Sequence, residues 1–428
     1  GRAVTAAGLE QTHANIGINA QPIGEYTTCG TGADNDVIVM THKLSPWKQH
    51  AITAEIALDF CMARKEVKVL PPRKAGDVKG FPMDPVSQGV VGAAFAQTAA
   101  KRTTLATVAW YGALGGVAPD LDVLFQSSTD PLLFLEFHRQ FTHSLVFIPV
   151  GAFLVFLVLK AIASRIKILQ GLSTSQGYLA CLMGYATHGL LDSCTSYGTQ
   201  LFWPFSDVRV AWDTMSIVDP LFTVPLLVFV IAAARTKRLW LSWLACAWML
   251  TFFIVGWWQH ERAMQAAQQI ASIREHEPLR LSVKPSFANL LVWKAIYEFD
   301  GKYYVDAVRV GIDSTWYPGA RVQKLDVARD FPALRSDSRQ AQDIERFRWF
   351  SHDYLSPMEN SPRIVDMRYS LVPNEVDPMW GIDIDARSQG DHVSWWSSRE
   401  LTDIKQRNFL YMVIGMGGIP LQDETVKP

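Results

Sequence analysis

The stretch that decides the predicted fold is residues 239–259, LWLSWLACAWMLTFFIVGWWQ. It contains no Asp, Glu, Lys or Arg, and it closes on the pair Trp257-Trp258. A helix needs about 20 apolar residues to cross the hydrocarbon core of a bilayer, and aromatic side chains gather at the two interfaces. We therefore expect this segment to span a membrane, and we place a soluble enzyme last among the alternatives.

The region before this segment contains more apolar runs, namely 86–100, 103–118, 145–159, 177–191 and 214–234. The first two are rich in Gly and Ala and are separated by Lys101-Arg102, a pattern that indicates a closely packed helical hairpin. We predict a mainly α fold in which residues 83–260 form a polytopic α-helical membrane domain.

The composition changes again after residue 260. A polar, helix-prone stretch is followed by runs typical of strands and by one further helical patch, over 262–276, 302–310, 338–350, 363–369 and 379–384. Clusters of Gly, Pro, Asp and Asn separate them, as turns require. Residues 261–428 are therefore predicted to form a small α+β extramembrane domain.

Residues 1–82 have neither character. No segment there shows the charged, apolar and small-residue order of a signal peptide, and Met83 would make a natural start. We interpret residues 1–82 as a poorly ordered or mis-assigned N-terminal extension, with a regulatory segment as the alternative.

The overall composition excludes several classes of protein. The chain has 428 residues, 49% of them hydrophobic and 19% charged, with a formal net charge of −1. A nucleic-acid binder would carry a basic excess, and a disordered chain would be more polar and more charged. The five cysteines are widely scattered, which argues against a disulfide framework and a zinc finger.

Basic residues fall into three groups along the predicted membrane domain: Lys101-Arg102, then Lys160, Arg165 and Lys167, then Arg235, Lys237 and Arg238. These groups occupy alternate connections between the apolar runs, and cytoplasmic loops are enriched in Lys and Arg. The predicted location is the bacterial inner membrane, multi-pass, with the polar motifs and the C-terminal domain on the periplasmic side.

Two polar motifs follow the apolar runs. In Pro119-Asp120-Leu121-Asp122, two carboxylates two residues apart can enter one pocket and bind a divalent metal, although such turns are often only solvated. In His138-Arg139-Gln140-Phe141-Thr142-His143-Ser144, the imidazoles converge only if a helix begins near Phe141. Arg139 could bind an anionic substrate, and the alternative is a pair of interfacial histidines.

Further along, His188 and Asp192 are spaced i, i+4 and share one helix face, either as part of a metal site or as a hydrogen-bonded pair within the helix. Asp219 precedes Pro220 and could serve as a general base or simply as a helix N-cap. Placing one ionisable side chain at the centre of a membrane-spanning helix costs about 2.5–3.5 kcal/mol of free energy, and positions near the helix ends cost less. Because a bound cation would compensate this cost, we favour a metal site.

Residues 83–225 resemble a family of bacterial membrane-bound metal-dependent hydrolases, of the LexA-regulated inner-membrane type. The matching strings, in family order, are MDPVSQGVVGAA, GGVAPDLD, FHRQFTHS, ATHGLLDSCTSYGTQLFWPFSD and SIVDPLFT. The resemblance implies divalent-metal-dependent hydrolysis, with metal ligands at Asp120, Asp122, His138, His143, His188 and Asp192. One departure is Ser87-Gln88, where the family usually has Thr-His, so one metal position could be altered, lost or filled by water.

The sequence thus predicts a membrane-embedded metal-dependent hydrolase that activates a water at the outer leaflet, with Asp122 or Asp219 as general base and Arg139 stabilising negative charge. Zinc is the expected metal. Membrane lipids and a lipid-linked ester or phosphoester are the expected partners, and no nucleic acid is expected. The alternative is a non-catalytic polytopic membrane protein with a structural or ion-handling polar cluster.

Overall fold

The computed structural model describes residues 15–18, 27–28, 37–38 and 84–421. The chain divides into two compact units, residues 1–74 and 75–428. The described part of the first unit is a three-stranded sheet of order β2-β1-β3, with β1 Asn15–Ile18, β2 Thr27–Thr28 and β3 Val37–Ile38. The rest of the predicted N-terminal extension lies outside the described residues, so its interpretation stays a prediction.

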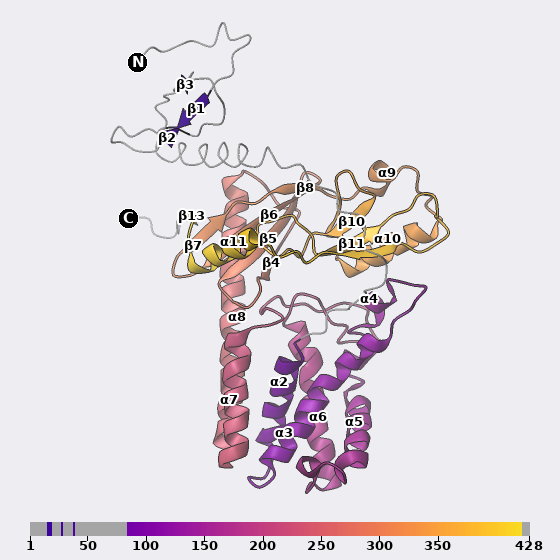
Figure 1. Cartoon of the computed structure of the whole chain (residues 1–428), viewed down its shortest axis with the longest axis vertical. Helices are drawn as coiled ribbons and strands as arrows, with labels where there is room; N and C mark the ends of the chain where they lie inside the picture. Colours follow the sequence, from indigo (N-terminus) through magenta and orange to yellow (C-terminus); the bar gives the residue numbers. More distant parts are fainter. Residues whose placement is uncertain (1–14, 19–26, 29–36, 39–83, 422–428) are drawn as a thin grey trace. The chain divides into compact units, whose positions relative to one another are not determined.

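The second unit begins with a group of helices (Figure 1). Its longer helices are α2 Pro85–Thr98, α3 Leu105–Val117, α5 Ile148–Ala163, α6 Thr174–Ser193, α7 Pro220–Thr236 and α8 Trp240–Ile273. Short helical turns lie between them: η1 Ala118–Leu124, α4 Leu133–Phe137, η2 Phe141–His143 and η3 Lys167–Leu169. The polar motifs of the sequence fall on these short turns and on the C-terminal end of α6.

Helices α3 and α6 cross almost backbone to backbone. A Cβ atom added to Gly184 of α6 would lie 2.0 Å from the carbonyl oxygen of Gly112 of α3, so any larger residue there would force the helices apart. The start of α6 is fixed by a capping box, in which Ser173 and Gln176 satisfy each other's backbone N–H groups. These two features set the height and the rotation of α6 relative to α3.

The remainder of the second unit contains two antiparallel sheets. The first has the order β13-β7-β6-β5-β4, with β8 paired to β6; its strands are β4 Arg280–Pro285, β5 Val292–Phe299, β6 Lys302–Val310, β7 Ser314–Tyr317, β8 Arg321–Gln323 and β13 Ile419–Leu421. The second has the order β12-β11-β10-β9; its strands are β9 Leu355–Pro357, β10 Arg363–Asp366, β11 Trp380–Asp383 and β12 Ser394–Ser397. Three further helices accompany the sheets: α9 Val327–Asp330, α10 Arg339–Phe350 and α11 Asp403–Ile414.

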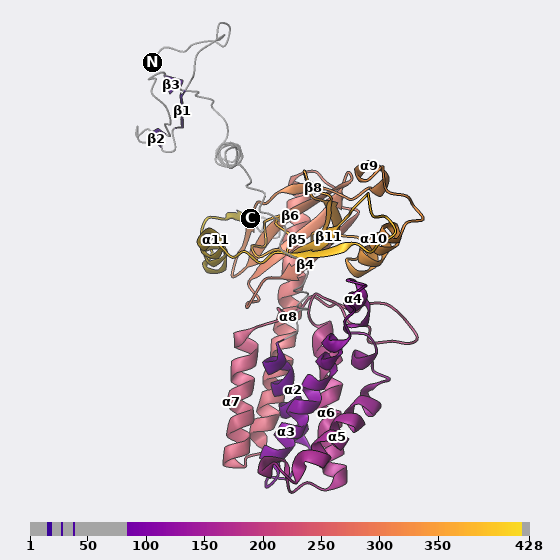
Figure 2. The same cartoon turned by 45° about the vertical axis from the view of Figure 1, so that its right-hand side comes forward.

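Helix α8 joins the helices to the first sheet. Its N-terminal half runs beside α7, and its C-terminal half packs Ala267 and Ile270 against Val283 of β4 and Trp293 of β5 (Figures 1 and 2). One continuous hydrophobic helix therefore contributes to two cores.

The second sheet meets the helices at α4. Leu135 of α4 belongs to the same hydrophobic cluster as Phe347 of α10 and Trp380 of β11. On α10, Arg346 forms ion pairs with Asp130 (2.8 Å) and Glu136 (2.5 Å), which flank and belong to α4. The contact between the helices and the second sheet thus combines a shared core with a charged network.

The prediction of a mainly α fold with a polytopic α-helical membrane domain was wrong. Among the described residues, only α8 is long and apolar enough by itself to cross a membrane. A second span is reached only if Leu133–His143 and Ile148–Ala163, which meet at 87°, are taken as one broken element. The second unit also contains two antiparallel sheets.

The error came from equating apolar runs with spanning helices. At 1.5 Å per residue, the 14 residues of α2, the 13 of α3 and the 16 of α5 fall short of a hydrocarbon core about 30 Å thick. Helix α6 has 20 residues but is too polar to pass the same test.

Several predicted elements are confirmed. The strand predicted at 302–310 is β6, and those at 363–369 and 379–384 contain β10 and β11. The helical patch at 338–350 is α10, capped by Ser338. The helical hairpin around Lys101-Arg102 is the pair α2 and α3.

Candidate metal centre

The Pro119-Asp120-Leu121-Asp122 motif forms the tight helical turn η1 directly after α3. Pro119 is tolerated there because the first N–H groups of a helical turn need no partner within the turn. Asp120 and Asp122 are 8% and 1% exposed, whereas Leu121 between them is 61% exposed. Both carboxylates therefore point into the protein, as the sequence analysis required.

The second motif places its three candidate residues at the junction of α4 and η2. His138 ends α4, Arg139 follows with a φ of +68°, and His143 lies in η2. A positive φ is costly for a residue with a Cβ atom and is found where other contacts enforce it. At Arg139 the backbone N–H donates to Asp122 (3.0 Å) and the carbonyl accepts from Gln200 (2.9 Å).

His188 and Asp192 lie one turn apart on α6, and both are fully buried. They come together with Asp120 and His143, residues that are far away in sequence. The four side chains Asp120, His143, His188 and Asp192 each offer one ligand atom, and these atoms all lie within 4.8 Å of one another. The structure thus brings the predicted acidic and imidazole groups to one point.

The separations between the offered atoms suit a small metal ion. The Nε2 atom of His143 lies 3.4 Å from Asp120 Oδ1, 3.3 Å from Asp192 Oδ2 and 2.8 Å from His188 Nε2. His188 Nε2 lies 3.3 Å from Asp120 Oδ1 and 3.7 Å from Asp192 Oδ2. Ligands about 2.0–2.1 Å from a tetrahedral zinc ion would lie about 3.3 Å apart, close to most of these distances.

In His143 and His188, the second ring nitrogen, Nδ1, makes a contact that determines which nitrogen carries the ring proton. His188 Nδ1 donates to the carbonyl of Gly116 at 2.5 Å, and this approach is possible because α3 and α6 cross so closely. His143 Nδ1 contacts Thr142 Oγ1 at 2.9 Å, and that hydroxyl in turn donates to Asp122 at 2.7 Å. Both rings consequently direct the Nε2 lone pair toward the shared point, the arrangement that metal-binding histidines usually have.

Unpaired buried atoms mark the same point. Both carboxylate oxygens of Asp120 are buried without a hydrogen-bond partner among the described residues, and Oδ2 of Asp192 makes no hydrogen bond there but lies 3.2 Å from the guanidinium Nε of Arg139. A buried carboxylate oxygen without a donor is strongly destabilising, and a bound cation removes that cost. The donor set of two imidazole nitrogens and two carboxylate oxygens therefore fits a divalent metal ion.

Asp122 contacts the Nδ1 atoms of the neighbouring histidines His138 and His143. Its Oδ1 contacts His138 Nδ1 at 2.7 Å, and its Oδ2 accepts from Arg139 N and Thr142 Oγ1. Asp120, Asp122 and His138 form a second group of possible ligands. Since Asp122 is already engaged by several donors, its geometry suits an orienting carboxylate better than a general base.

The two carboxylates are ionised at neutral pH. Burial alone would raise the pKa of Asp122, but hydrogen bonds from His138 and His143 outweigh it and hold the pKa well below its ordinary value. The pKa of Asp120 is also lowered: burial raises it, and the nearby imidazoles of His188 and His143 lower it by more than burial raises it. An ionised carboxylate is the form that binds metal.

Asp219 has a different position. Its Oδ1 accepts from the backbone N–H groups of Leu221 (2.9 Å) and Phe222 (3.3 Å), so it is the N-cap of α7. Neither group of possible metal ligands among the described residues includes it. The capping alternative considered for this residue is the one that the structure shows.

Gln88, noted in the sequence as a departure, also reaches the site. Its Nε2 donates to Asp192 Oδ1 at 2.6 Å, while its Oε1 is buried without a partner among the described residues. The amide thus holds one oxygen of Asp192, whose other oxygen is among the possible ligand atoms.

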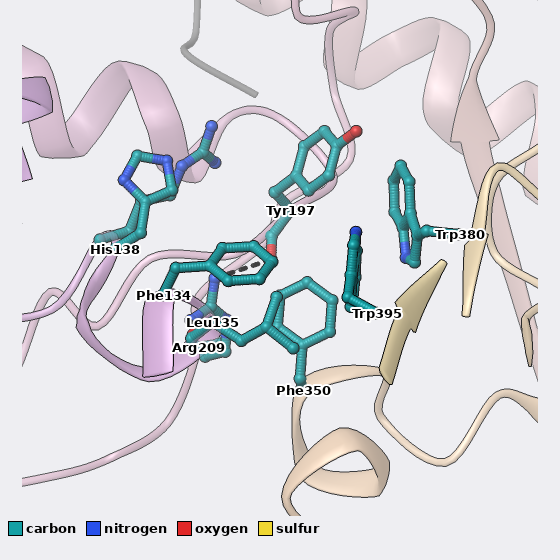
Figure 3. A pocket seen from close by; sticks show the side chains of 9 residues that line it. Phe134, Leu135, His138, Tyr197, Arg209, Phe350, Trp380 and Trp395 are labelled. Atoms are coloured by element: carbon teal, nitrogen blue, oxygen red, sulfur yellow. Dashed lines mark hydrogen bonds between the residues drawn. The ribbon is translucent and has the colours of Figure 1, made fainter. Parts of the chain in front are cut away.

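Sequence reasoning missed the aromatic surroundings of the site. A cavity of about 50 Å³ lies next to His138 and Arg139 (Figure 3). Its other walls come from α4, from the segment between α6 and α7, from α10 and from the second sheet; they include Tyr197, Arg209, Phe350, Trp380 and Trp395. Only the tertiary contact between the helices and the sheet creates this cavity, so no local sequence pattern indicated it.

Comparison with known proteins gives one finding. Residues 83–263 match the family model described as YdjM inner membrane protein. The match covers helices α2 to α7, the first part of α8 and the metal-ligand candidates but not the sheets, and it supports an inner-membrane protein family. That description names neither an activity nor a metal. No curated protein and no solved structure matches the chain.

Proposed function

We propose that residues 83–263, the segment that matches the YdjM inner membrane protein family, form the centre of a divalent-metal-dependent hydrolase acting on ester or phosphoester bonds at the membrane. The observation that carries this proposal is the convergence of Asp120, His143, His188 and Asp192 on one buried point. The unpaired oxygens there and the two facing Nε2 atoms support a cation at the centre of the group.

Zinc is the metal that we propose. Two imidazole nitrogens and two carboxylate oxygens at near-tetrahedral separations suit zinc better than calcium or magnesium, which prefer more oxygen ligands. When bound, such an ion supplies a Lewis acid that lowers the pKa of a coordinated water toward about 7.

Side chains of the protein then supply proton transfer and stabilisation of charge. Asp122 holds Nδ1 of His138, which leaves the buried and unpaired Nε2 of that ring able to accept the proton of the attacking water. The water oxygen bonds to the phosphorus or carbonyl carbon, the ester bond to the leaving oxygen breaks, and that oxygen takes up the proton that His138 accepted from the water. Arg139, beside the cavity, offsets the negative charge that develops.

Helix α8 supports the proposed location at the inner membrane. Only 28% of its apolar window is buried inside the protein, and Trp240, Trp243, Trp257 and Trp258 are exposed on it, which favours contact with lipid. Arg235, Lys237 and Arg238 precede the helix, so the positive-inside rule supports a cytoplasmic N-terminal end and sheets on the periplasmic side. Lipid-linked esters or phosphoesters are substrates that a site at this position could reach.

The test is hydrolysis by the full chain purified in mild detergent. A panel of phospholipids, lipid pyrophosphates and soluble aryl phosphates or esters is assayed before chelation, after chelation, and after addition of zinc. We expect turnover of one class, lost on chelation, restored by zinc and reduced at least a hundredfold in Asp120→Asn. Asp207→Asn, which changes an exposed carboxylate, is the matched control. Turnover that is unaffected by chelation, or absent for every class, would favour the non-catalytic alternative.

A further inference from the structure

The cavity beside the candidate metal centre has a mostly apolar, aromatic lining, to which two arginines and one histidine also contribute. It is bounded by His138 and Arg139 from the end of α4, by Arg209, and by the rings of Phe350, Trp380 and Trp395. Figure 3 shows His138 on one side and Trp380 and Trp395, which belong to strands of the second sheet, on the other. Within the part of the chain that the structure describes, no Asp or Glu lines the cavity.

Three polar side chains on this lining are Arg139, Arg209 and His138, and each has a nitrogen atom that makes no hydrogen bond among the described residues. Arg139 and Arg209 are 2% and 6% exposed. Nη1 of Arg139, Nε of Arg209 and Nε2 of His138 are all buried without a hydrogen-bond partner among the described residues. Buried donors normally find an acceptor, because an unpaired one costs about 1–3 kcal/mol.

Arg209 is held firmly in place. Its Nη1 donates to the carbonyl of Leu135, and its Nη2 donates to the carbonyls of Tyr197 (3.3 Å) and Gly198 (2.9 Å). These acceptors are neutral, so they orient the guanidinium without cancelling its charge. Burial, together with the charges of Arg139 and Arg368, lowers the pKa of Arg209 to about 9, as expected of a cation that lacks an anionic partner.

We propose that this cavity binds the phosphoryl group of the substrate, and that the aromatic side chains of the second sheet bind the apolar part attached to it. The inference rests on the proposed hydrolase function and names its substrate class: phosphoesters with an apolar or aromatic organic group.

Three features support this assignment, and the first of them favours a phosphoryl group over a carboxylate. Two arginines line the cavity, Arg209 with no carboxylate partner among the described residues and Arg139 with one nitrogen, Nε, paired to Asp192 at 3.2 Å, and a phosphoryl dianion offers more charge and more acceptor oxygens than a carboxylate does. The volume of about 50 Å³ is several times the roughly 10–15 Å³ that one water needs, so a compact group fits but a whole substrate does not. The cavity also adjoins His138 and Arg139, which places the bound group next to the metal-ligand cluster.

The aromatic side chains on the sheet side of the cavity determine which organic group of the substrate can bind. Trp395 of β12 packs edge-on against Phe134 (centroids 5.1 Å apart), and Tyr197 stacks with Trp380 (5.5 Å). Flat aromatic surfaces of this kind favour apolar and aromatic groups. The second sheet would thus complete the substrate site of the helices, which gives the C-terminal region a role in function.

The experiment measures binding of phenylphosphonate, whose carbon–phosphorus bond is not hydrolysed, to the full chain in detergent by calorimetry. Inorganic phosphate and benzoate are compared with it, and phosphatidic acid in mixed micelles is added as a competitor. The variants are Trp395→Leu and Arg209→Gln. Their controls are Trp396→Leu, the next residue on β12, which contacts Arg363 instead of the cavity, and Arg363→Gln. Thermal unfolding and metal content are recorded for each sample.

We expect phenylphosphonate to bind more tightly than benzoate. Trp395→Leu should weaken phenylphosphonate about tenfold and leave inorganic phosphate unchanged, whereas Arg209→Gln should weaken both. If phosphatidic acid competes with phenylphosphonate, the phosphoryl group comes from a lipid headgroup. If phosphatidic acid does not compete, the phosphoryl group comes from a soluble phosphoester. Benzoate binding as tightly as phenylphosphonate, or equal effects of Trp395→Leu and Trp396→Leu, would overturn the inference.

These outcomes are independent of the hydrolase proposal. Phenylphosphonate binding that depends on Trp395 in a protein without bound metal would support the cavity and remove the hydrolase. Metal binding without any phosphonate binding would leave the hydrolase proposal standing and would remove the proposed role of the cavity. Arg209→Gln could also lower stability through its lost carbonyl contacts, and in that case Trp395→Leu, which breaks no hydrogen bond given for Trp395, decides the matter.

Discussion

His143 and His188 face each other with their Nε2 atoms 2.8 Å apart, while the Nδ1 atom of each ring is already engaged by a neighbour. Two lone pairs at this distance repel unless a proton or a cation lies between them. Asp120 and Asp192, on either side, add negative charge that a cation would balance. The pair is therefore the geometric centre of the proposed metal site.

Asp122 is expected to tune the site without binding the metal. In Asp122→Asn the Nδ1 contacts of His138 and His143 lose a charged acceptor, while the side-chain volume is unchanged. Loss of such a partner of a metal-binding histidine typically costs 10–100-fold in metal affinity. Zinc titration against a chelating indicator checks this value, with Asp207→Asn as control. An unchanged zinc affinity in Asp122→Asn would remove the orienting role.

The helix crossing is expected to be essential for the site. In Gly184→Ala the new methyl group would meet the backbone of Gly112, so α6 must shift away from α3 and carry His188 and Asp192 with it. We predict loss of metal binding and a fall in unfolding temperature of several degrees, measured by metal analysis and by thermal unfolding.

Gly390→Ala is the matched control, because a Cβ atom there meets nothing within 4 Å. If Gly184→Ala and Gly390→Ala bound metal equally well, the close crossing would not be what positions His188.

Gln88 is expected to limit the affinity of the site. Its amide donates to Asp192, and its own oxygen is unpaired, so Gln88→His puts a potential nitrogen ligand beside the same carboxylate. We predict slower loss of zinc to a chelator, by about tenfold, measured with a colorimetric chelator. Gln88→Leu, which removes the donor and adds no ligand, should lose zinc faster than the unmodified protein. The same release rate for all three proteins would contradict this prediction.

A buried lysine in the first sheet predicts a pH dependence of stability. Burial lowers the pKa of Lys294 to about 7, although the charges of Asp366, Glu375 and Asp306 raise it in part. In the unfolded chain its pKa is about 10.4. Between these two values the unfolded chain binds more protons than the folded protein does, so stability rises with pH in that window.

The unfolding temperature should therefore rise between pH 7 and pH 9, and Lys294→Met should flatten the rise. Lys284→Met serves as control, because Lys284 is paired with Asp213 at 3.0 Å. A rise that is equally steep in Lys294→Met would show that another group causes it.

The sequence could predict local elements and the composition of the site better than the overall fold. Strand β6 was predicted at its observed bounds because its alternation and flanking turns are local signals. The convergence of Asp120 with His188 followed from the cost of leaving ionisable groups unpaired near apolar helices. Helix length could not be inferred in this way, because an apolar run does not show where the backbone turns, as at the 87° bend before Ile148.

Other features depend on contacts that no local pattern records. Arg209 and Trp395 are 186 positions apart in sequence, and they line one cavity only because α4 and α10 share a hydrophobic core. Asp219 had two interpretations from its sequence neighbours alone, and only the backbone geometry of α7 separated them.

The central claim is that Asp120, His143, His188 and Asp192 hold one divalent cation, and metal analysis of the purified full chain tests it most directly. The protein is prepared in detergent without chelator, supplied with zinc and dialysed, alongside His188→Ala, Asp192→Ala and the exposed control Asp207→Asn. We predict about one zinc per chain in the unmodified protein and the control, and almost none in the two site variants, with similar elution volumes for all four. Equal zinc in all four proteins, or none in any of them, would contradict the account.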